Sequence, residues 1–204
     1  MKRIQFLFIL TLFVTCNQPG AKEDKVSPVT EASAIPEKRQ SVPIIKNPDA
    51  GTPFGQLDYD RVVAYDYEGD AKGDGREIIV EDGKLAPKIS KKMELSQEQV
   101  NSLTGFLGAN ETYGGGTASC FDPHMGLVFY EGEKVVMHVS ICMECNRLSA
   151  SIPIPATQYH LRNADTTDAF ALEGFSKAGQ EKLSQLCGEL GFSHCKGNPE
   201  VAGQ

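Results

Sequence analysis

The chain has 204 residues, of which 40% are hydrophobic and 23% are charged, which is enough for one small packed domain and a tail. The formal net charge of -7 excludes the basic face that a nucleic-acid-binding protein presents, so nucleic acid is not an expected partner. The sequence also has no apolar run of the roughly 18 to 20 residues that a membrane-spanning helix needs.

The N-terminal segment 1–15 has the organisation of a signal peptide. Two basic residues precede a largely apolar run at 4–14, which is too short to span a membrane, and Cys16 follows at once. The sequence Phe-Val-Thr-Cys that ends at Cys16 resembles the lipobox of bacterial lipoproteins, although Phe13 and Thr15 replace the residues most often found there. The alternative is an ordinary secretory signal with an unmodified cysteine.

The resemblance to lipoproteins implies cleavage before Cys16 and acylation of this cysteine, for example with palmitate. Several acyl chains anchor a protein stably, so the resemblance places the chain at a membrane of the cell envelope, on its periplasmic or surface face. Asn17 follows the cysteine in place of the Asp that retains some lipoproteins in the inner membrane, which favours the outer membrane.

Residues 16–56 are expected to form the lipidated cysteine and a disordered tether. This segment is rich in proline, lysine and glutamate, and its apolar residues are sparse and show no regular period. Such a composition cannot bury enough apolar surface to offset the entropy cost of folding. A flexible segment of this length would span roughly 35 Å.

Residues 57–197 are expected to form one small α+β domain of antiparallel hairpins and two packed helices, with a flexible tail at 198–204. Apolar periodicity, the turn signal Asp82-Gly83 and a capping box at 96–99 define the elements. In chain order, we expect strands at 61–67, 76–81 and 84–89, a helix that begins near 96 and includes 107, strands at 126–130, 135–142 and 152–161, and a helix at 176–190.

Five further cysteines follow Cys16, and an exported domain normally pairs its thiols. Because five is odd, at least one of them is free, bonded to another chain or a metal ligand. If the strands at 126–130 and 135–142 form a hairpin in which Glu131 faces Lys134, Cys120 comes to lie opposite Cys145.

The same register places His124 opposite Ile141. The sequence therefore predicts that Cys120, His124, Cys142 and Cys145 gather at one end of this hairpin. The simplest interpretation of the cluster is structural. A disulfide would join Cys120 to Cys145 or to Cys142, and one thiol would stay buried as a small apolar side chain.

A second disulfide, Cys187–Cys195, would tie the last helix to the turn that follows it. The second interpretation of the cluster is a zinc site, because three thiolates and the imidazole of His124 suit tetrahedral zinc. The third is a redox site. The motif Cys142-Met-Glu-Cys145 has the spacing of thioredoxin-like active sites, although those motifs open a helix and this one closes a strand.

The expected function is that of a lipid-anchored cell-envelope protein with a binding or accessory domain, whose cysteine cluster is held by disulfides or by zinc. No motif typical of hydrolases, zinc peptidases or nucleotide-binding enzymes occurs, which favours a protein without catalytic activity, and no catalytic residue is assigned. The alternative is a zinc- or thiol-dependent envelope enzyme that uses Cys142 and Cys145. The expected partners are the membrane, through the lipid, and an envelope protein or a small ligand.

Overall fold

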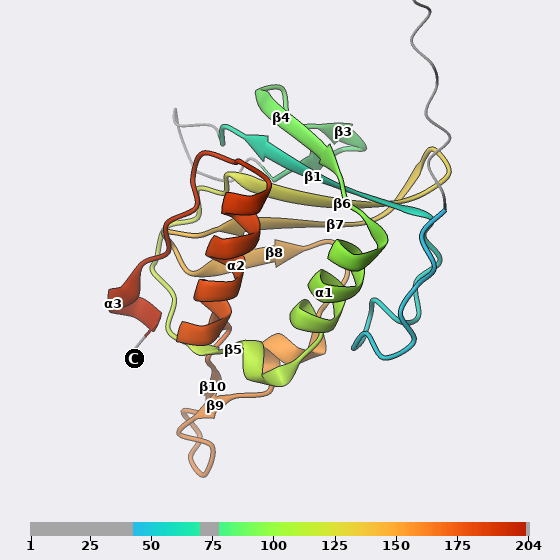
Figure 1. The fold of residues 1–204 in the computed structure, drawn as a ribbon. Helices are drawn as coiled ribbons and strands as arrows, with labels where there is room; N and C mark the ends of the chain where they lie inside the picture. Colours follow the sequence, from blue (N-terminus) through green and yellow to red (C-terminus); the bar gives the residue numbers. More distant parts are fainter. Residues whose placement is uncertain (1–42, 70–77, 203–204) are drawn as a thin grey trace, which may run out of the picture. The chain divides into compact units, whose positions relative to one another are not determined.

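The computed structural model describes residues 43–69 and 78–202, which belong to a compact unit that spans residues 41–204 (Figure 1). The expected signal peptide, the lipidation site Cys16 and the tether as far as residue 42 lie outside the described residues. Within the described ranges, no helix is long and apolar enough to cross a bilayer.

A five-stranded sheet forms the centre of this unit. Its strands lie in the order β4-β1-β6-β7-β8, which Figure 1 shows from top to bottom. Every neighbouring pair of these strands is antiparallel. The strands are β1 (Arg61–Tyr67), β4 (Ile89–Glu94), β6 (Met125–Glu131), β7 (Lys134–Cys142) and β8 (Arg147–Ala150).

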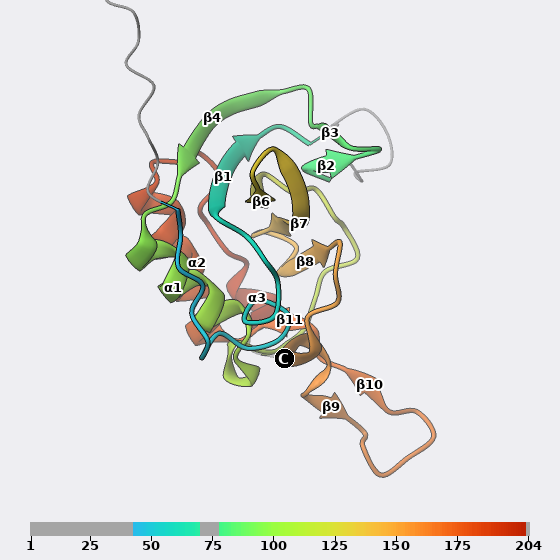
Figure 2. The ribbon, with the colours of Figure 1, turned by 90° about the vertical axis from the view of Figure 1, so that its right-hand side faces the viewer.

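Two helices, α1 (Gln97–Leu107) and α2 (Lys177–Glu189), lie on the same face of the sheet in both views (Figure 2). Their buried apolar side chains join those of the sheet in one cluster, because a helix with one apolar stripe must cover that stripe with other apolar groups. The predicted α+β class, with antiparallel hairpins and two packed helices, is confirmed. A short third helix, α3 (Pro199–Ala202), lies in the segment expected to be a flexible tail.

The opposite face of the sheet carries a smaller apolar cluster, to which β1 and β6 contribute Tyr65 and Val128. A small hairpin of β2 (Val80–Glu81) and β3 (Lys84–Leu85) follows, with its turn at Asp82-Gly83 as predicted. The predicted extent of the return strand, 84–89, is wrong. The segment divides around Pro87, and its second part begins β4, which pairs with β1 at the edge of the sheet.

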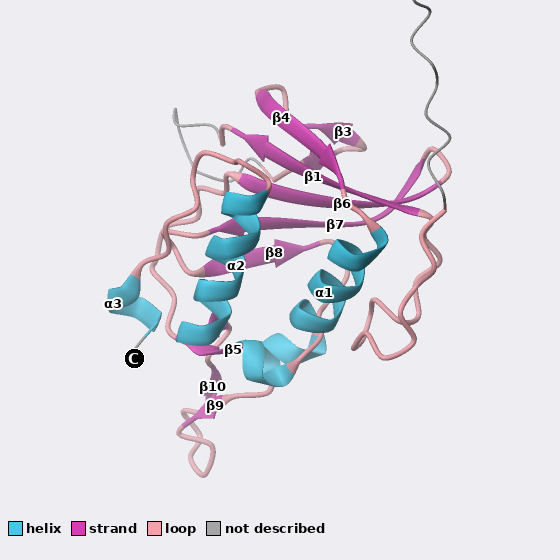
Figure 3. Cartoon of the chain, viewed as in Figure 1, coloured by secondary structure: helices cyan, strands magenta, loops and turns pink. Residues whose placement is uncertain are grey.

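The strand expected at 152–161 does not form. Proline cannot donate a ladder hydrogen bond, and in this segment Pro155 instead begins the 3-10 helix η2. The remaining elements are short (Figure 3). They are the 3-10 helices η1 (Asn110–Thr112) and η2 (Pro155–Gln158), the pair β5 (Tyr113–Gly115) and β11 (Gly174–Phe175), and the pair β9 (Leu161–Arg162) and β10 (Phe170–Ala171).

The folded part of the chain begins earlier than the predicted boundary at residue 57. Ala50 and Phe54 belong to the apolar cluster between the sheet and the helices, and the ring of Phe54 lies 5.6 Å from that of Phe129. Gly51 is in close contact with Gly108 at the end of α1. The later part of the proposed tether is therefore part of the domain.

The hairpin of β6 and β7 has the predicted register at its tip, where Glu131 faces Lys134. The register shifts by one residue between Phe129 and Tyr130, so that Met125 rather than His124 faces Ile141. A bulge of this kind adds one residue to one strand and increases the local twist. The shift leaves the cysteines at the same end of the hairpin.

Candidate functional site

Two of the cysteines lie at a tight turn between β7 and β8. Cys142 is the last residue of β7, and Cys145 lies within the turn. The following residue, Asn146, has a φ of 52°, a left-handed conformation that asparagine tolerates better than most residues. Its buried side-chain amide donates hydrogen bonds to the carbonyl oxygens of Gly116 (2.8 Å) and Phe175 (2.9 Å), which fixes the turn to two other segments.

Cys142 and Cys145 form a disulfide with a sulfur–sulfur distance of 2.05 Å. Each residue is only 1% exposed, so a thiol in solution cannot reach either sulfur directly. The backbone N–H of Cys145 donates a hydrogen bond of 3.1 Å to the sulfur of Cys142. This donor would stabilise negative charge on Cys142 if the disulfide opened.

Cys120 is a free and exposed thiol beside this disulfide. Its sulfur lies 2.8 Å from the sulfur of Cys145. Backbone contacts hold its segment along the turn, because the N–H of Ala118 donates to the carbonyl of Cys145 (2.9 Å) and the N–H of Asp122 donates to the Cys145 sulfur (3.5 Å). The three sulfurs of Cys120, Cys142 and Cys145, which we call the cysteine cluster, lie within 4.8 Å of one another.

The structure pairs the cysteines differently from the sequence prediction. Cys145 bonds to Cys142 rather than to Cys120, and the unpaired thiol, Cys120, is exposed rather than buried. The turn after β7 brings the two ends of the Cys-x2-Cys motif together within one chain segment, so the local bond forms. Cys187 and Cys195, the other expected pair, are bonded at 1.98 Å.

His124 does not join the cysteine cluster, so the described residues do not assemble the expected four-ligand zinc set of Cys120, His124, Cys142 and Cys145. The backbone of His124 is hydrogen-bonded on one side to Tyr67 and on the other to Ile141. This pairing fixes the residue, and its ring stacks on that of His194 with the ring centres 3.8 Å apart.

Glu68 lies beside these two histidines, His124 and His194, which we call the histidine pair. Its carboxylate oxygens lie 3.9 Å from Nδ1 of His124 and 3.7 Å from Nε2 of His194. Asp122 links the two groups, since its backbone contacts the Cys145 sulfur and its carboxylate lies 3.5 Å from Nε2 of His124. Sequence reasoning missed the roles of Glu68 and His194, because no local pattern connects residues so far apart in the chain.

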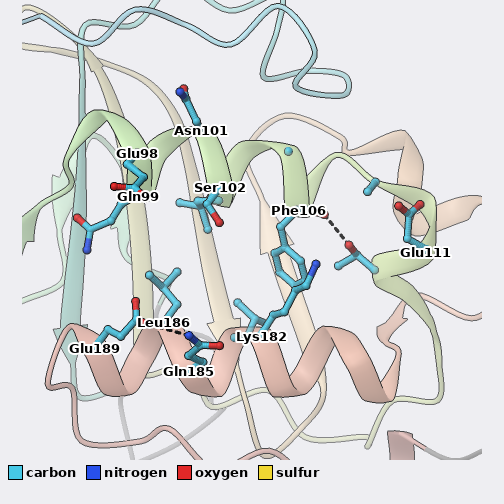
Figure 4. A pocket seen from close by; sticks show the side chains of 15 residues that line it. Glu98, Gln99, Asn101, Ser102, Phe106, Glu111, Lys182, Gln185, Leu186 and Glu189 are labelled. Carbon is cyan, nitrogen blue, oxygen red and sulfur yellow. Dashed lines mark hydrogen bonds between the residues drawn. The ribbon is translucent and has the colours of Figure 1, made fainter.

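A groove with a volume of about 710 Å³ lies elsewhere, between α1 and α2 (Figure 4). Leu103, Phe106, Leu183 and Leu186 line it with apolar surface, and Glu98, Glu111, Glu189 and Lys182 line it with charge. The ammonium of Lys182 lies 5.8 Å from the centre of the Phe106 ring. Of the described residues that line the groove, none is a cysteine or a histidine, so it is separate from both clusters.

Comparison of the chain with protein-family models, with curated proteins and with solved structures finds no match. The function is therefore inferred from the chemistry of the residues described above. The cysteine cluster is the strongest candidate, because it combines a buried disulfide with an exposed thiol. A small movement of the Cys120 sulfur would bring it to bonding distance from Cys145.

Proposed function

We propose that the protein is a lipid-anchored accessory protein of the cell envelope whose cysteine cluster exchanges disulfides with a thiol partner through Cys120. The single observation that supports the exchange is the distance of 2.8 Å between the sulfurs of Cys120 and Cys145, beside the bonded Cys142. The N-terminal resemblance to lipoproteins supports the anchor at Cys16.

The exchange begins within the chain. The Cys120 thiol loses its proton to solvent, and the thiolate attacks the sulfur of Cys145. A Cys120–Cys145 bond forms, the Cys142–Cys145 bond breaks, and Cys142 leaves as a thiolate that the N–H of Cys145 stabilises at 3.1 Å. No electrons are gained or lost in this step, because one disulfide replaces another.

The rearranged disulfide would be open to attack from outside, since Cys120 is exposed and the original pair is buried. A thiolate from a partner attacks the sulfur of Cys120, forms a mixed disulfide with it and displaces Cys145 as a thiolate. Cys120 is therefore the point of entry to the cluster. The partner is an envelope protein with an accessible thiol, or a small thiol compound.

Reduced glutathione under anaerobic conditions tests this proposal, with the full-length unreduced protein. The wild type is expected to gain one glutathione, which peptide mass mapping locates at Cys120. The Cys120→Ser variant should gain none, because its disulfide is buried, while Ser119→Ala, a neighbouring change that keeps every sulfur, should react as the wild type does. An unmodified wild type, or an equal adduct on the Cys120→Ser variant, would refute the exchange.

A zinc site is the second candidate for the same residues, because the three sulfurs lie within 4.8 Å of one another. Once reduced, three thiolates can hold zinc and leave its fourth position open. Zinc content of reduced protein tests this possibility. A zinc content that is lower by one equivalent in the Cys145→Ser variant than in the wild type would favour the zinc site over exchange.

The anchor is tested by replacing Cys16. The Cys16→Ser protein should leave the membrane fraction or accumulate unprocessed, because it cannot be acylated. Cys120→Ser serves as a matched control and should remain with the membranes. Normal processing and unchanged membrane retention of the Cys16→Ser protein would contradict lipidation.

A further inference from the structure

We propose that Glu68, His124 and His194 form a binding site for a divalent transition-metal ion, most suitably zinc, that is independent of the cysteine cluster. The site follows from the convergence of three side chains from distant parts of the chain. Glu68 follows β1, His124 precedes β6, and His194 lies in the loop after α2. One ligand atom from each lies within 4.8 Å of the other two.

The distances between these atoms fit a shared ion. Two ligand atoms that each lie about 2.1 Å from one zinc ion are about 3.4 Å apart in tetrahedral geometry and at most about 4.2 Å apart. Oε2 of Glu68 lies 3.9 Å from Nδ1 of His124, and Oε1 of the same carboxylate lies 3.7 Å from Nε2 of His194. These distances exceed a direct hydrogen bond and leave room for an ion between the atoms.

The loop that carries His194 is fixed from three directions. The Cys187–Cys195 disulfide closes it beside the histidine. Ser193 donates hydrogen bonds from its N–H (3.1 Å) and its hydroxyl (2.7 Å) to the buried carboxylate of Asp66. The ammonium of Lys91 donates to the carbonyl of Leu190 at 2.7 Å, at the start of the same loop. The backbone of His194 is therefore held in place, and metal binding requires that the two imidazole rings turn out of their stack so that both lone pairs point at one ion.

Asp122 orients His124 for this role. Its carboxylate lies 3.5 Å from Nε2 of His124, on the side of the ring away from Nδ1. When the proton is on Nε2 it points at this carboxylate and the lone pair of Nδ1 is available, which is the carboxylate–histidine–metal arrangement common in zinc proteins. The other oxygen of Asp122 is buried and has no hydrogen-bond partner in the described part of the chain.

Without metal, the opposite tautomer is the better one. Nδ1 of His124 lies 3.1 Å from the carbonyl oxygen of Tyr67, which can only accept a hydrogen bond, so the proton belongs on Nδ1. Metal binding at Nδ1 therefore requires that the ring turn away from the Tyr67 carbonyl and that the proton move to Nε2, beside Asp122. Asp122 is a positioning residue, and Glu68, His124 and His194 are the ligands.

The nature of the ligands selects the ion. Two imidazole nitrogens and one carboxylate oxygen suit zinc, copper or nickel rather than magnesium or calcium, which prefer oxygen ligands alone. Glu68 and Asp122 bring two negative charges beside the histidine pair, which balance those of a divalent ion. Three protein ligands leave a fourth position for water or for a ligand from solution.

The test uses the full-length, unreduced protein with Cys120→Ser, so that the cysteine cluster offers no thiol. Zinc is titrated in competition with a chromophoric chelator. One equivalent should bind, and His194→Ala and Glu68→Gln should each weaken binding at least tenfold. Asp122→Asn should weaken it by about 10-fold, as expected for a residue behind a ligand. His160→Ala, which removes a histidine elsewhere, should have no effect.

Cobalt provides a second readout, because it reports the atoms that bind it. Visible absorption bands without a sulfur-to-cobalt charge-transfer band are expected, and they should vanish in Glu68→Gln, an exposed substitution that leaves the fold intact. Absence of stoichiometric binding, or an affinity of the His194→Ala and Glu68→Gln proteins equal to that of the parent Cys120→Ser protein, would overturn the site. The glutathione reaction at Cys120 does not depend on this outcome, so the two proposals can fail separately.

Discussion

His138 lies on β7, and its ring nitrogen Nδ1 is buried without a hydrogen-bond partner in the part of the chain that the structure describes. Burial lowers the pKa of its imidazole, because the charged form loses solvation inside the protein. In the unfolded chain a histidine titrates near pH 6.5, so on acidification the unfolded state takes up this proton first. The contribution of His138 to stability is therefore lost as the pH falls below about 6.5.

Replacing His138 with glutamine should reduce the sensitivity of the domain to acid, because the new side chain does not titrate. Urea unfolding at pH 7.5 and pH 5.5 measures the effect. We expect the free energy of unfolding to fall less between these values in the His138→Gln protein than in the wild type. His160→Gln serves as the control, and an equal fall in the His138→Gln and wild-type proteins would show that His138 is not responsible.

At the level of single residues, the sequence predicted the Cys187–Cys195 disulfide and the members of the cysteine cluster, but not which cysteines of the cluster are bonded. Hairpin register alone brings Cys120, Cys142 and Cys145 to one end of β6 and β7, and a shift of one residue does not separate them. The choice of partner for Cys145 depends on the shape of a four-residue turn, which residue spacing does not define. The contact between His124 and His194 spans 70 positions and has no local signal.

The N-terminus of α1 is stabilised by a capping box. The hydroxyl of Ser96 accepts a hydrogen bond from the N–H of Gln99 (3.2 Å), and the Gln99 side chain accepts one from the N–H of Ser96 (2.9 Å). Ser96→Ala should lower the free energy of unfolding by about 1 kcal/mol, measured in urea. Ser102→Ala changes an exposed serine on the same helix and should not destabilise the protein. A Ser96→Ala protein as stable as this control would contradict the role of the cap.

The end of α2 depends on a different restraint, the disulfide between Cys187 and Cys195. Closure of so short a loop stabilises a fold by about 2 to 3 kcal/mol, chiefly by restricting the unfolded chain. The Cys187→Ala/Cys195→Ala double variant should lose about this much free energy of unfolding. Urea unfolding under non-reducing conditions measures it, and an unchanged midpoint would contradict the prediction.

Among the elements, the sequence predicted the start of the first helix and both ends of the second to within one residue, and the strands less well. The capping serines, Ser96 and Ser176, and the apolar spacing within each helix are local signals. The pairing of β4 with β1 joins segments about 30 residues apart, and no pattern within β4 indicates its partner. The six residues of β4 are also mostly exposed, so they lack the apolar run that marks a buried strand.

The N-terminal boundary of the domain depends on how the whole molecule packs. Phe54 is 0% exposed and packs on Phe129, so residues before 57 complete the main apolar cluster. A chain that begins at residue 41 should unfold in urea as the full-length protein does. A chain that begins at residue 57 should lose about 3 to 5 kcal/mol, as expected when a buried phenylalanine is removed. Equal stability of the two truncated chains would contradict this boundary.

Composition placed this boundary too late because it describes a segment and not its partners. The stretch at 43–56 has few apolar residues and three prolines, which is typical of a tether. Its buried side chains Ala50 and Phe54 are stabilised by packing against the sheet and the helices. Burial of this kind becomes visible only when the whole domain is assembled.

His194 lies immediately before Cys195, so the Cys187–Cys195 disulfide helps to hold its imidazole beside His124. A newly made chain whose thiols are still reduced lacks the covalent link that holds this loop against α2. The loop is then held without it, by hydrogen bonds such as those of Ser193 to Asp66 and of Lys91 to the Leu190 carbonyl, so the imidazole of His194 is less firmly placed beside His124. Oxidation of these two thiols should therefore make the contact between the two histidine rings more rigid.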